Sequence, residues 1–244
     1  SLLMEIKQDT IGDILDSEKE MVLDGVRFGE YFVNASEFNH LLNEFIKSVD
    51  IDRYFFAMFL SQIRKHHTLA LFSAVRFHHI QAMMNVRQVL EAGSWAAYAI
   101  ANTEKEKFYE EADGLISYPE SLKKKRNTWL EENFSESSNN LKVAIKSIGD
   151  TVAHSNVVYA QKNFKFNFDT GKFETPFFDY ENDFHIKADL WWIANIAYGL
   201  MDLFYGVNKN LNVIKFSDDF LLRIKDLRTK NDKLKEEALK NRKI

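Results

Sequence analysis

The stretch from Ile51 to Asn102 constrains the fold of this chain more than any other segment, because it contains no proline and only one glycine, Gly93. Proline interrupts helices and glycine weakens them, so a long segment without them favours continuous helix. From Phe72 to Ile100, apolar side chains recur in steps of three and four residues, which is the spacing of one helix face. We therefore expect a helix of about seven turns or more over this part of the chain.

A second helix is expected just upstream, where Tyr54, Met58, Leu60 and Ile63 lie at compatible spacing. The polar residues 64–67 follow it and allow two interpretations. They form either a bend between two helices or a solvated turn of one continuous rod. In both interpretations the segment is mainly α-helical.

The first 35 residues are mixed in polarity and carry three glycines, which predicts short elements, including a strand around Met21 to Val26. Ser36, with Glu37 in the following turn, has the residue type of a helix N-cap. We expect the first clear helix to begin there. Its apolar face would comprise Leu41, Leu42, Phe45 and Ile46.

Three further helices are expected in the middle of the chain. The first covers residues 104–112, and the second runs to about residue 133 from Pro119, a residue suited to a first helical turn. The polar residues 135–140 then predict a loop, whose last asparagines cap a third helix over 141–158.

The spacing changes after this third helix. Phe164, Phe166 and Phe168 alternate with polar residues, and a turn of the type Asp-Thr-Gly precedes Phe173. This alternation is typical of a β-hairpin, which we place near residues 163–178.

Helical spacing resumes over residues 183–204, and a last helix begins near Ser217. The last helix becomes very polar after Leu227. Because short polar helices are marginal in water, we expect residues 228–244 to project or fray unless a partner covers them.

Together these patterns predict a mainly α fold, a bundle of about six or seven helices with one inserted β-hairpin. The chain divides into N-terminal short elements (1–35), the helical bundle with its hairpin (36–215) and a polar C-terminal helix (216–244). With 244 residues, the chain can bury a substantial core.

Composition disfavours several classes of function. The chain has no cysteine, which removes disulfides, thiolate zinc sites and cysteine nucleophiles and fits a reducing compartment. No apolar run approaches the roughly 20 residues of a membrane span, so we expect a cytoplasmic protein without a membrane segment. The sequence also lacks a glycine-rich phosphate loop, a Gly-x-Ser-x-Gly elbow and a Rossmann fingerprint, which disfavours those enzymes and their cofactors.

The net charge of −4 gives no global reason for this chain to bind nucleic acid. A single basic block, Lys123-Lys124-Lys125-Arg126, stands out locally. We interpret it first as a solvated helix face, with a patch for an RNA backbone as the alternative.

Arg87 and Glu91 are four residues apart and are therefore neighbours on one helix face. The first interpretation is a structural ion pair at the edge of the core, which needs satisfied hydrogen bonds to be tolerated. The alternative is that one of the two faces a pocket and orients a ligand or a histidine.

His154 lies at or near the end of the predicted third helix, just before the hairpin. Its unperturbed pKa near neutrality suits a general acid or base, and the alternative is a capping or core histidine bonded to the backbone. Another histidine completes Glu37-x-x-His40, half of a helical di-metal motif, but the sequence has no second Glu-x-x-His. A metal site is therefore not the leading interpretation.

The order of these features resembles that of the HEPN-like helical proteins, bacterial bundles linked to toxin–antitoxin and phage-defence systems. The resemblance covers about residues 40–210. It rests on a long helix with Arg87-x-x-x-Glu91, a later helix ending in Val152-Ala153-His154-Ser155, an inserted hairpin and a long aromatic helix.

The resemblance implies a site. Family members that act as metal-independent ribonucleases use an arginine, then four to six residues, then a histidine. The histidine serves as acid or base on the 2′-hydroxyl or leaving oxygen, and the arginine neutralises the phosphate. His154 matches the histidine, but no arginine stands at that spacing, and the nearest upstream cation is Lys146. Arg87, on a neighbouring helix, is the substitute that we consider.

Two function hypotheses follow. In the first, a pocket near Arg87, Glu91 and His154 binds RNA or a nucleotide, with or without metal-independent ribonuclease activity. In the second, the protein is a non-catalytic interaction module of a bacterial stress or defence system, and its C-terminal helix recruits a protein partner. We expect a homodimer and no cofactor or metal, and we keep a di-metal enzyme as a minor third option.

Overall fold

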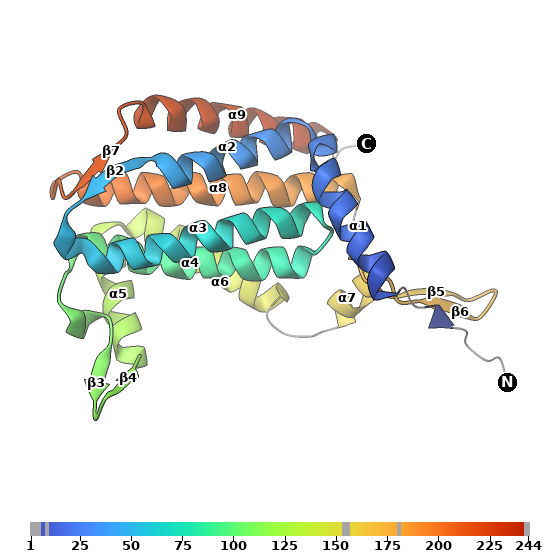
Figure 1. Cartoon of the computed structure of the whole chain (residues 1–244), viewed down its shortest axis with the longest axis horizontal. Helices are drawn as coiled ribbons and strands as arrows, with labels where there is room; N and C mark the ends of the chain where they lie inside the picture. Colours follow the sequence, from blue (N-terminus) through green and yellow to red (C-terminus); the bar gives the residue numbers. More distant parts are fainter. Residues whose placement is uncertain (1–5, 8–9, 153–156, 180–181, 242–244) are drawn as a thin grey trace.

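A computed structural model describes residues 6–7, 10–152, 157–179 and 182–241 of the chain. The molecule is a helical bundle with short strand pairs around it, so the predicted mainly α fold with a hairpin is confirmed (Figure 1). Helices with an apolar stripe can bury it only against one another, which is why a bundle forms. Its main helices are α2 (Glu30–Glu44), α3 (Tyr54–Val75), α4 (His79–Ala101), α5 (Glu120–Asn133), α6 (Ser135–Val152), α8 (Asp183–Asn208) and α9 (Phe220–Asn241).

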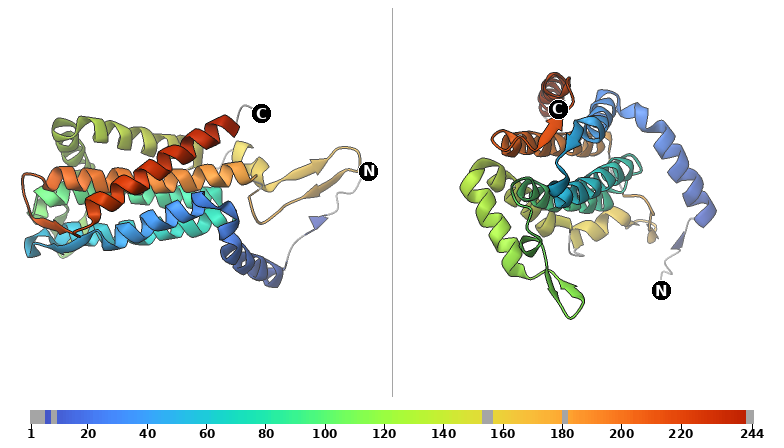
Figure 2. Two further views of the ribbon diagram at one scale, coloured as in Figure 1. Left: turned by 90° about the horizontal axis from the view of Figure 1, so that it is seen from above. Right: turned by 60° about the vertical axis from the view of Figure 1, so that its left-hand side comes forward.

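The helices pack in layers, with α4 near the centre (Figures 1 and 2). Helix α9 lies over α2 and α8, these two pack against α3 and α4, and α5 and α6 cover another side of α4. Gly93 permits a close contact in this centre, because a Cβ on it would lie 2.8 Å from Leu200 Cδ1 and closer still to Cδ2. Glycine thus lets α4 approach α8 at this point.

The stretch from Ile51 to Asn102 forms two antiparallel helices, so the expected single helix from Phe72 to Ile100 is wrong. A 3₁₀ turn, η2 (Ile51–Arg53), leads into α3, which is continuous through the polar residues 64–67. The chain reverses at Phe77, which has a φ of 58°. That residue lacks a glycine's freedom, so tertiary contacts hold the turn, and Phe77 O accepts a hydrogen bond of 2.8 Å from Asp179 N.

The N-terminal segment is helical, and the strand expected around Met21 to Val26 is wrong. Thr10 begins α1 (Ile11–Leu23) with a capping box, in which Thr10 Oγ1 accepts from Asp13 N at 3.1 Å and the Asp13 carboxylate accepts from Thr10 N. A 3₁₀ turn, η1 (Asp24–Phe28), follows. Helix α2 begins after Gly29, so Ser36 lies inside it and is not its N-cap.

Two predictions for the middle of the chain are also wrong. The helix expected over 104–112 is a 3₁₀ turn, η3 (Lys105–Lys107), and a hairpin of β3 (Glu110–Ala112) and β4 (Leu115–Ser117). Asp113 and Gly114 both have positive φ, as the two-residue turn of a tight hairpin requires. The loop expected over 135–140 is the first part of α6.

The predicted hairpin near residues 163–178 is confirmed. It pairs β5 (Lys165–Asn167) with β6 (Lys172–Glu174), and Phe166 lies opposite Phe173. Strand β1 (Ile6–Lys7) adds to it in parallel with β6. The remaining short elements are β2 (Ile46–Val49), which pairs with β7 (Ile214–Phe216), and the helical turns α7 (Val157–Ala160) and η4 (Gln161–Asn163).

The C-terminal helix is packed on the bundle, so the expectation that residues 228–244 project or fray is wrong for the described part, which extends to residue 241. Trp191 Nε1 donates to Asn231 O at 2.8 Å, and the Tyr31 hydroxyl donates to Leu234 O at the same distance. Leu234 is 6% exposed. This helix is part of the core, which removes the basis for treating it as a free recruiting arm.

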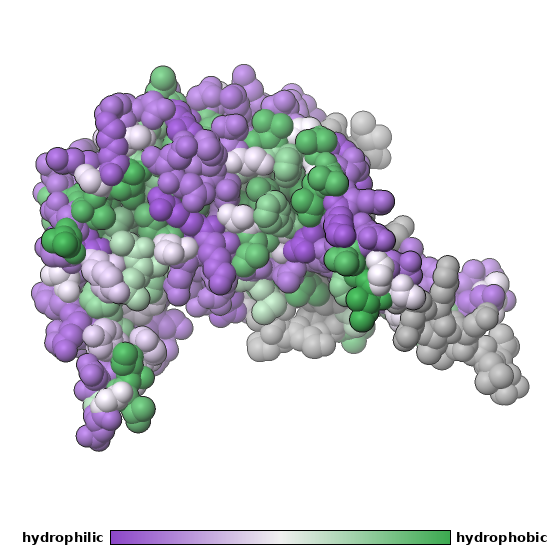
Figure 3. Space-filling view, in the orientation of Figure 1, coloured by the Kyte–Doolittle hydropathy of each residue, from purple (hydrophilic) through white to green (hydrophobic). Residues whose placement is uncertain are grey.

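Helix α1 projects from the bundle and contributes no buried residue (Figure 1). Apolar residues gather along it on the face shown in Figure 3, and Ile11 and Leu23 are largely exposed. An ionic cluster holds α1 against the bundle. The Glu18 carboxylate accepts a hydrogen bond of 2.6 Å from Arg76 Nη1, and it also bonds His78 Nε2. The cluster attaches α1 to the turn between α3 and α4.

Candidate functional site

Arg87 and Glu91 form an ion pair on α4, in which Arg87 Nε donates to Glu91 Oε1 at 3.0 Å. Each side chain is about a third exposed, so the pair lies at the edge of the core. His154 lies outside the described residues, and its place beside this pair stays a prediction.

The pair lines a cavity of about 200 Å³ between α4, α5 and α6. We call it the basic pocket, because five of its lining side chains are cationic and one, Glu91, is anionic. The cations come from three helices and are Arg87, Lys123, Arg126, Lys142 and Lys146. Arg87 and Glu91 thus form the ion pair of the first interpretation, and both also line a pocket.

Arg126 is the most unusual of these side chains, because it is only 3% exposed. One face of its guanidinium lies over the Trp95 ring at 4.5 Å, and Nε and Nη2 donate to Asn127 Oδ1 at 3.1 and 2.7 Å. Among the described residues it forms no ion pair. Burial lowers its pKa to about 10, while Glu91 acts in the opposite direction. The group is therefore a buried cation at neutral pH.

The other cations of the pocket are mostly paired. Three of them each have one carboxylate partner, in the pairs Arg87–Glu91, Lys123–Glu120 and Lys142–Glu131. Lys146 has none within the part of the chain that the structure describes. Five cations with three partners leave an excess of two positive charges around the cavity.

Two further features bear on what the pocket can hold. Ser138 is 3% exposed and lines the cavity, and its hydroxyl makes no hydrogen bond to any described residue. Arg87 reaches across to α6, since a Cβ built on Gly149 would lie 3.2 Å from Arg87 Nη1. The Arg87 guanidinium thus lies directly beside Gly149, where a larger side chain would crowd it.

The basic block at residues 123–126 is split by the helix that carries it. Lys123 and Arg126 are three residues apart and share the face of α5 that lines the pocket, whereas Lys124 and Lys125 are exposed elsewhere. The solvated-face interpretation holds for Lys123, Lys124 and Lys125, which are exposed, and fails for the buried Arg126. The sequence contains a signal for the burial of Arg126, because Leu122 and Leu130 lie four residues to either side and are also buried.

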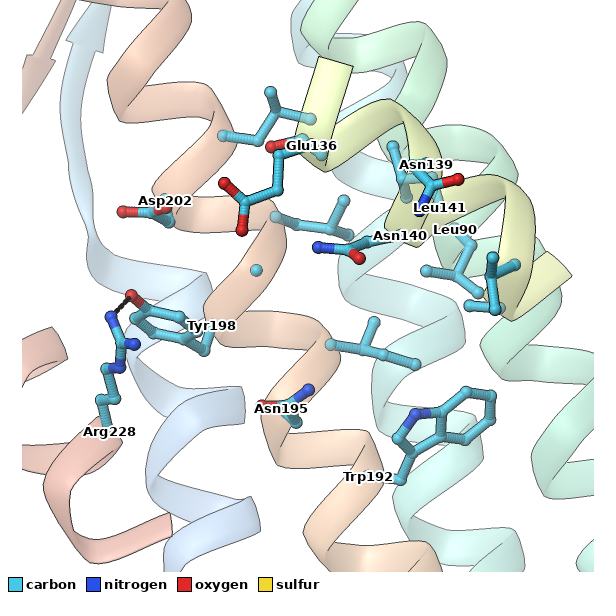
Figure 4. A pocket seen from close by; sticks show the side chains of 17 residues that line it. Leu90, Glu136, Asn139, Asn140, Leu141, Trp192, Asn195, Tyr198, Asp202 and Arg228 are labelled. Carbon is cyan, nitrogen blue, oxygen red and sulfur yellow. Dashed lines mark hydrogen bonds between the residues drawn. The ribbon is translucent and has the colours of Figure 1, made fainter. Parts of the chain in front are cut away.

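A larger cavity of about 730 Å³ lies between α6 and α8 (Figure 4). Its walls include Trp192 and three asparagines, and they carry the carboxylates of Glu136 and Asp202. Neither carboxylate is in an ion pair with a described residue. The lining cation, Arg228, donates to the Tyr198 hydroxyl (Figure 4). This balance repels phosphate, so α6 separates an acidic groove from the basic pocket.

Three of the described histidines have structural roles away from the pocket. His67 is buried, and His78 and His79 contact the carboxylates of Glu18 and Asp189. Across the described ranges, no group of three or more histidine, aspartate or glutamate side chains could hold a metal ion.

Comparison of the chain with protein-family models, with characterised proteins and with solved structures found no match. Among the helices that the structure describes, none combines the length and the apolar character that crossing a membrane requires. With no matching protein to compare, we infer a function from the residues of the basic pocket.

Proposed function

We propose that the basic pocket between α4, α5 and α6 binds phosphate groups of RNA or of a nucleotide. The observation that carries this proposal is Arg126, a nearly fully buried guanidinium without a carboxylate partner among the described residues. Buried charges in proteins are almost always paired. A guanidinium in this situation suits a phosphate, whose oxygens accept its fork of N–H donors.

The charge around the pocket supports the same ligand class. The chain as a whole is negative, with a net charge of −4, whereas the basic pocket has an excess of two positive charges. The pocket therefore attracts anions locally, although the whole chain does not. The resemblance to HEPN-like proteins, stated from the sequence, favours RNA over other phosphate compounds.

We extend the proposal to catalysis through Arg87. Four residues separate Gly149 from His154, which is the spacing of the ribonuclease motif. The Arg87 guanidinium occupies the space beside Gly149, and it would neutralise the phosphate in place of the motif arginine. His154 would take the proton of the 2′-hydroxyl, whose oxygen attacks the adjacent phosphorus and expels the 5′-oxygen, and this oxygen takes a proton from water to leave as a hydroxyl. The product would carry a 2′,3′-cyclic phosphate.

Charge reversal tests the binding site. We expect the double variant Lys123→Glu, Lys146→Glu to bind a labelled single-stranded RNA at least tenfold more weakly than the wild type, measured by fluorescence anisotropy. The matched control is Lys124→Glu, Lys125→Glu, which changes net charge equally but lies outside the pocket. Equal loss in both variants would mean that only net charge matters, and it would refute the pocket.

Cleavage of a mixed RNA pool without added metal tests the catalytic extension. We expect His154→Ala and Arg87→Ala each to abolish cleavage, with His40→Ala, an exposed histidine on α2, as the control. Binding without cleavage by the wild type would leave a binding protein and reject the catalytic step. Cleavage that survives Arg87→Ala would reject the substitute arginine.

A further inference from the structure

The basic pocket is small, and two of its polar lining residues, Arg126 and Ser138, are buried. Sites that bury drug-sized ligands have volumes of about 300–1,000 Å³, whereas this cavity measures about 200 Å³. The cavity therefore suits a group the size of a phosphate better than a whole nucleotide.

Two of the hydrogen-bond donors that line the pocket are buried. Arg126 and Ser138 are each 3% exposed, so only a group that enters the cavity can contact both. A phosphate inside a nucleic-acid chain carries a sugar on both sides, which keeps it at the surface. A terminal phosphate carries one sugar and offers three oxygens to the pocket.

The charge fits a terminal phosphate as well. A phosphate monoester carries about −1.5 to −2 at neutral pH, and a diester carries a single charge. The pocket holds an excess of two positive charges from Arg126 and Lys146. The monoester neutralises this excess and the diester does not.

We infer that the basic pocket binds a terminal phosphate monoester, with Arg126 and Ser138 at its base and Lys146 at its mouth. This inference rests on the proposed function in its choice of RNA as the source of that phosphate. A free mononucleotide presents the same group, and a 5′- or 3′-end of RNA presents it equally.

The test compares one RNA sequence in three forms, with a 5′-phosphate, with a 3′-phosphate and with hydroxyls at both ends, together with free adenosine monophosphate. We expect a phosphorylated end to bind at least tenfold more tightly than the hydroxyl form. That preference should be lost in Lys146→Glu and kept in Lys125→Glu. Equal affinity for all three RNAs would overturn this inference and leave the proposed function standing.

Two further comparisons, with the mononucleotide and with a Ser138 variant, distinguish failure of the monoester site from failure of the RNA ligand. If the mononucleotide binds in a Lys146-dependent way and no RNA does, the monoester site stands and the proposed RNA ligand fails. Ser138→Ala serves where an Arg126 variant does not fold, because removing an unbonded hydroxyl leaves no unsatisfied group. We expect Ser138→Ala to reduce the preference for a phosphorylated end several-fold, and an unchanged preference would remove Ser138 from the site.

Discussion

Lowering the pH should destabilise this protein through His67. This histidine is 1% exposed, its Nε2 lies 3.0 Å from Ile193 O, and its Nδ1 lies 2.9 Å from Asn39 Nδ2. The carbonyl can only accept and the amide nitrogen can only donate, so the ring is neutral with its proton on Nε2. Protonation would add a proton to Nδ1, which would then face the N–H donor of the Asn39 amide inside the core.

The size of the effect follows from the pKa. Burial lowers the pKa of His67 to about 4, from 6.5 in the unfolded chain, although the bond to Ile193 acts in the opposite direction. A depressed pKa means that the unfolded state binds the proton first, so stability is full above pH 6.5 and falls as the pH drops towards 4. The difference corresponds to about 3 kcal/mol in full and to about 2 kcal/mol between pH 8 and pH 5.

Urea unfolding at several pH values between 8 and 5 measures this loss. The control is His67→Gln, which keeps a donor and an acceptor but does not titrate. We expect the free energy of unfolding of the wild type to fall by about 2 kcal/mol more than that of the variant over this range. Parallel curves would refute the argument, because the other titrating groups are common to both proteins.

Other predictions concern the core, the C-terminal helix and the candidate site. Gly93→Ala should lower the melting temperature, since its Cβ would overlap Leu200, and overpacking of this kind costs about 1–3 kcal/mol; an unchanged melting temperature would mean that the helices separate easily. Deleting residues 228–244 should unfold the chain as seen by circular dichroism, because it removes the buried Leu234, whereas a stable truncated protein would restore the recruiting-arm hypothesis. Arg87→Ala should cost less than about 1 kcal/mol of stability, as for exposed ion pairs, while weakening RNA binding; a comparable loss of folding would make the pair structural.

Much of the fold follows from periodicity, and the errors lie where tertiary contacts decide. The helices over 120–133 and 183–208 and the hairpin were predictable, since spacing and turn residues agree there. No glycine or proline at Phe77 predicts the reversal of the chain there. It depends on contacts from Asp179, a hundred residues away in the chain. Residues 135–140 look like a loop because serine and asparagine favour caps and turns, yet packing carries helix α6 through them.

The site was predictable in part. The spacing of Arg87 and Glu91 indicated their pairing, and the basic block drew attention to Arg126. The sequence could not show that three helices bring five cations around one cavity, because that depends on how the helices pack. Lys146 lies 59 residues from Arg87 in the chain, and only the fold makes them neighbours of the same pocket.

The salt dependence of RNA binding tests the central claim most directly. For single strands, the logarithm of the binding constant falls with the logarithm of salt concentration by about 0.7 for each phosphate contact. If the basic pocket holds RNA phosphate, the slope of Lys123→Glu, Lys146→Glu should be shallower than that of the wild type by about 0.7 for each phosphate contact that is lost. The Lys124→Glu, Lys125→Glu control should keep the wild-type slope. Identical slopes for all three proteins would contradict the claim that this pocket contacts the phosphate.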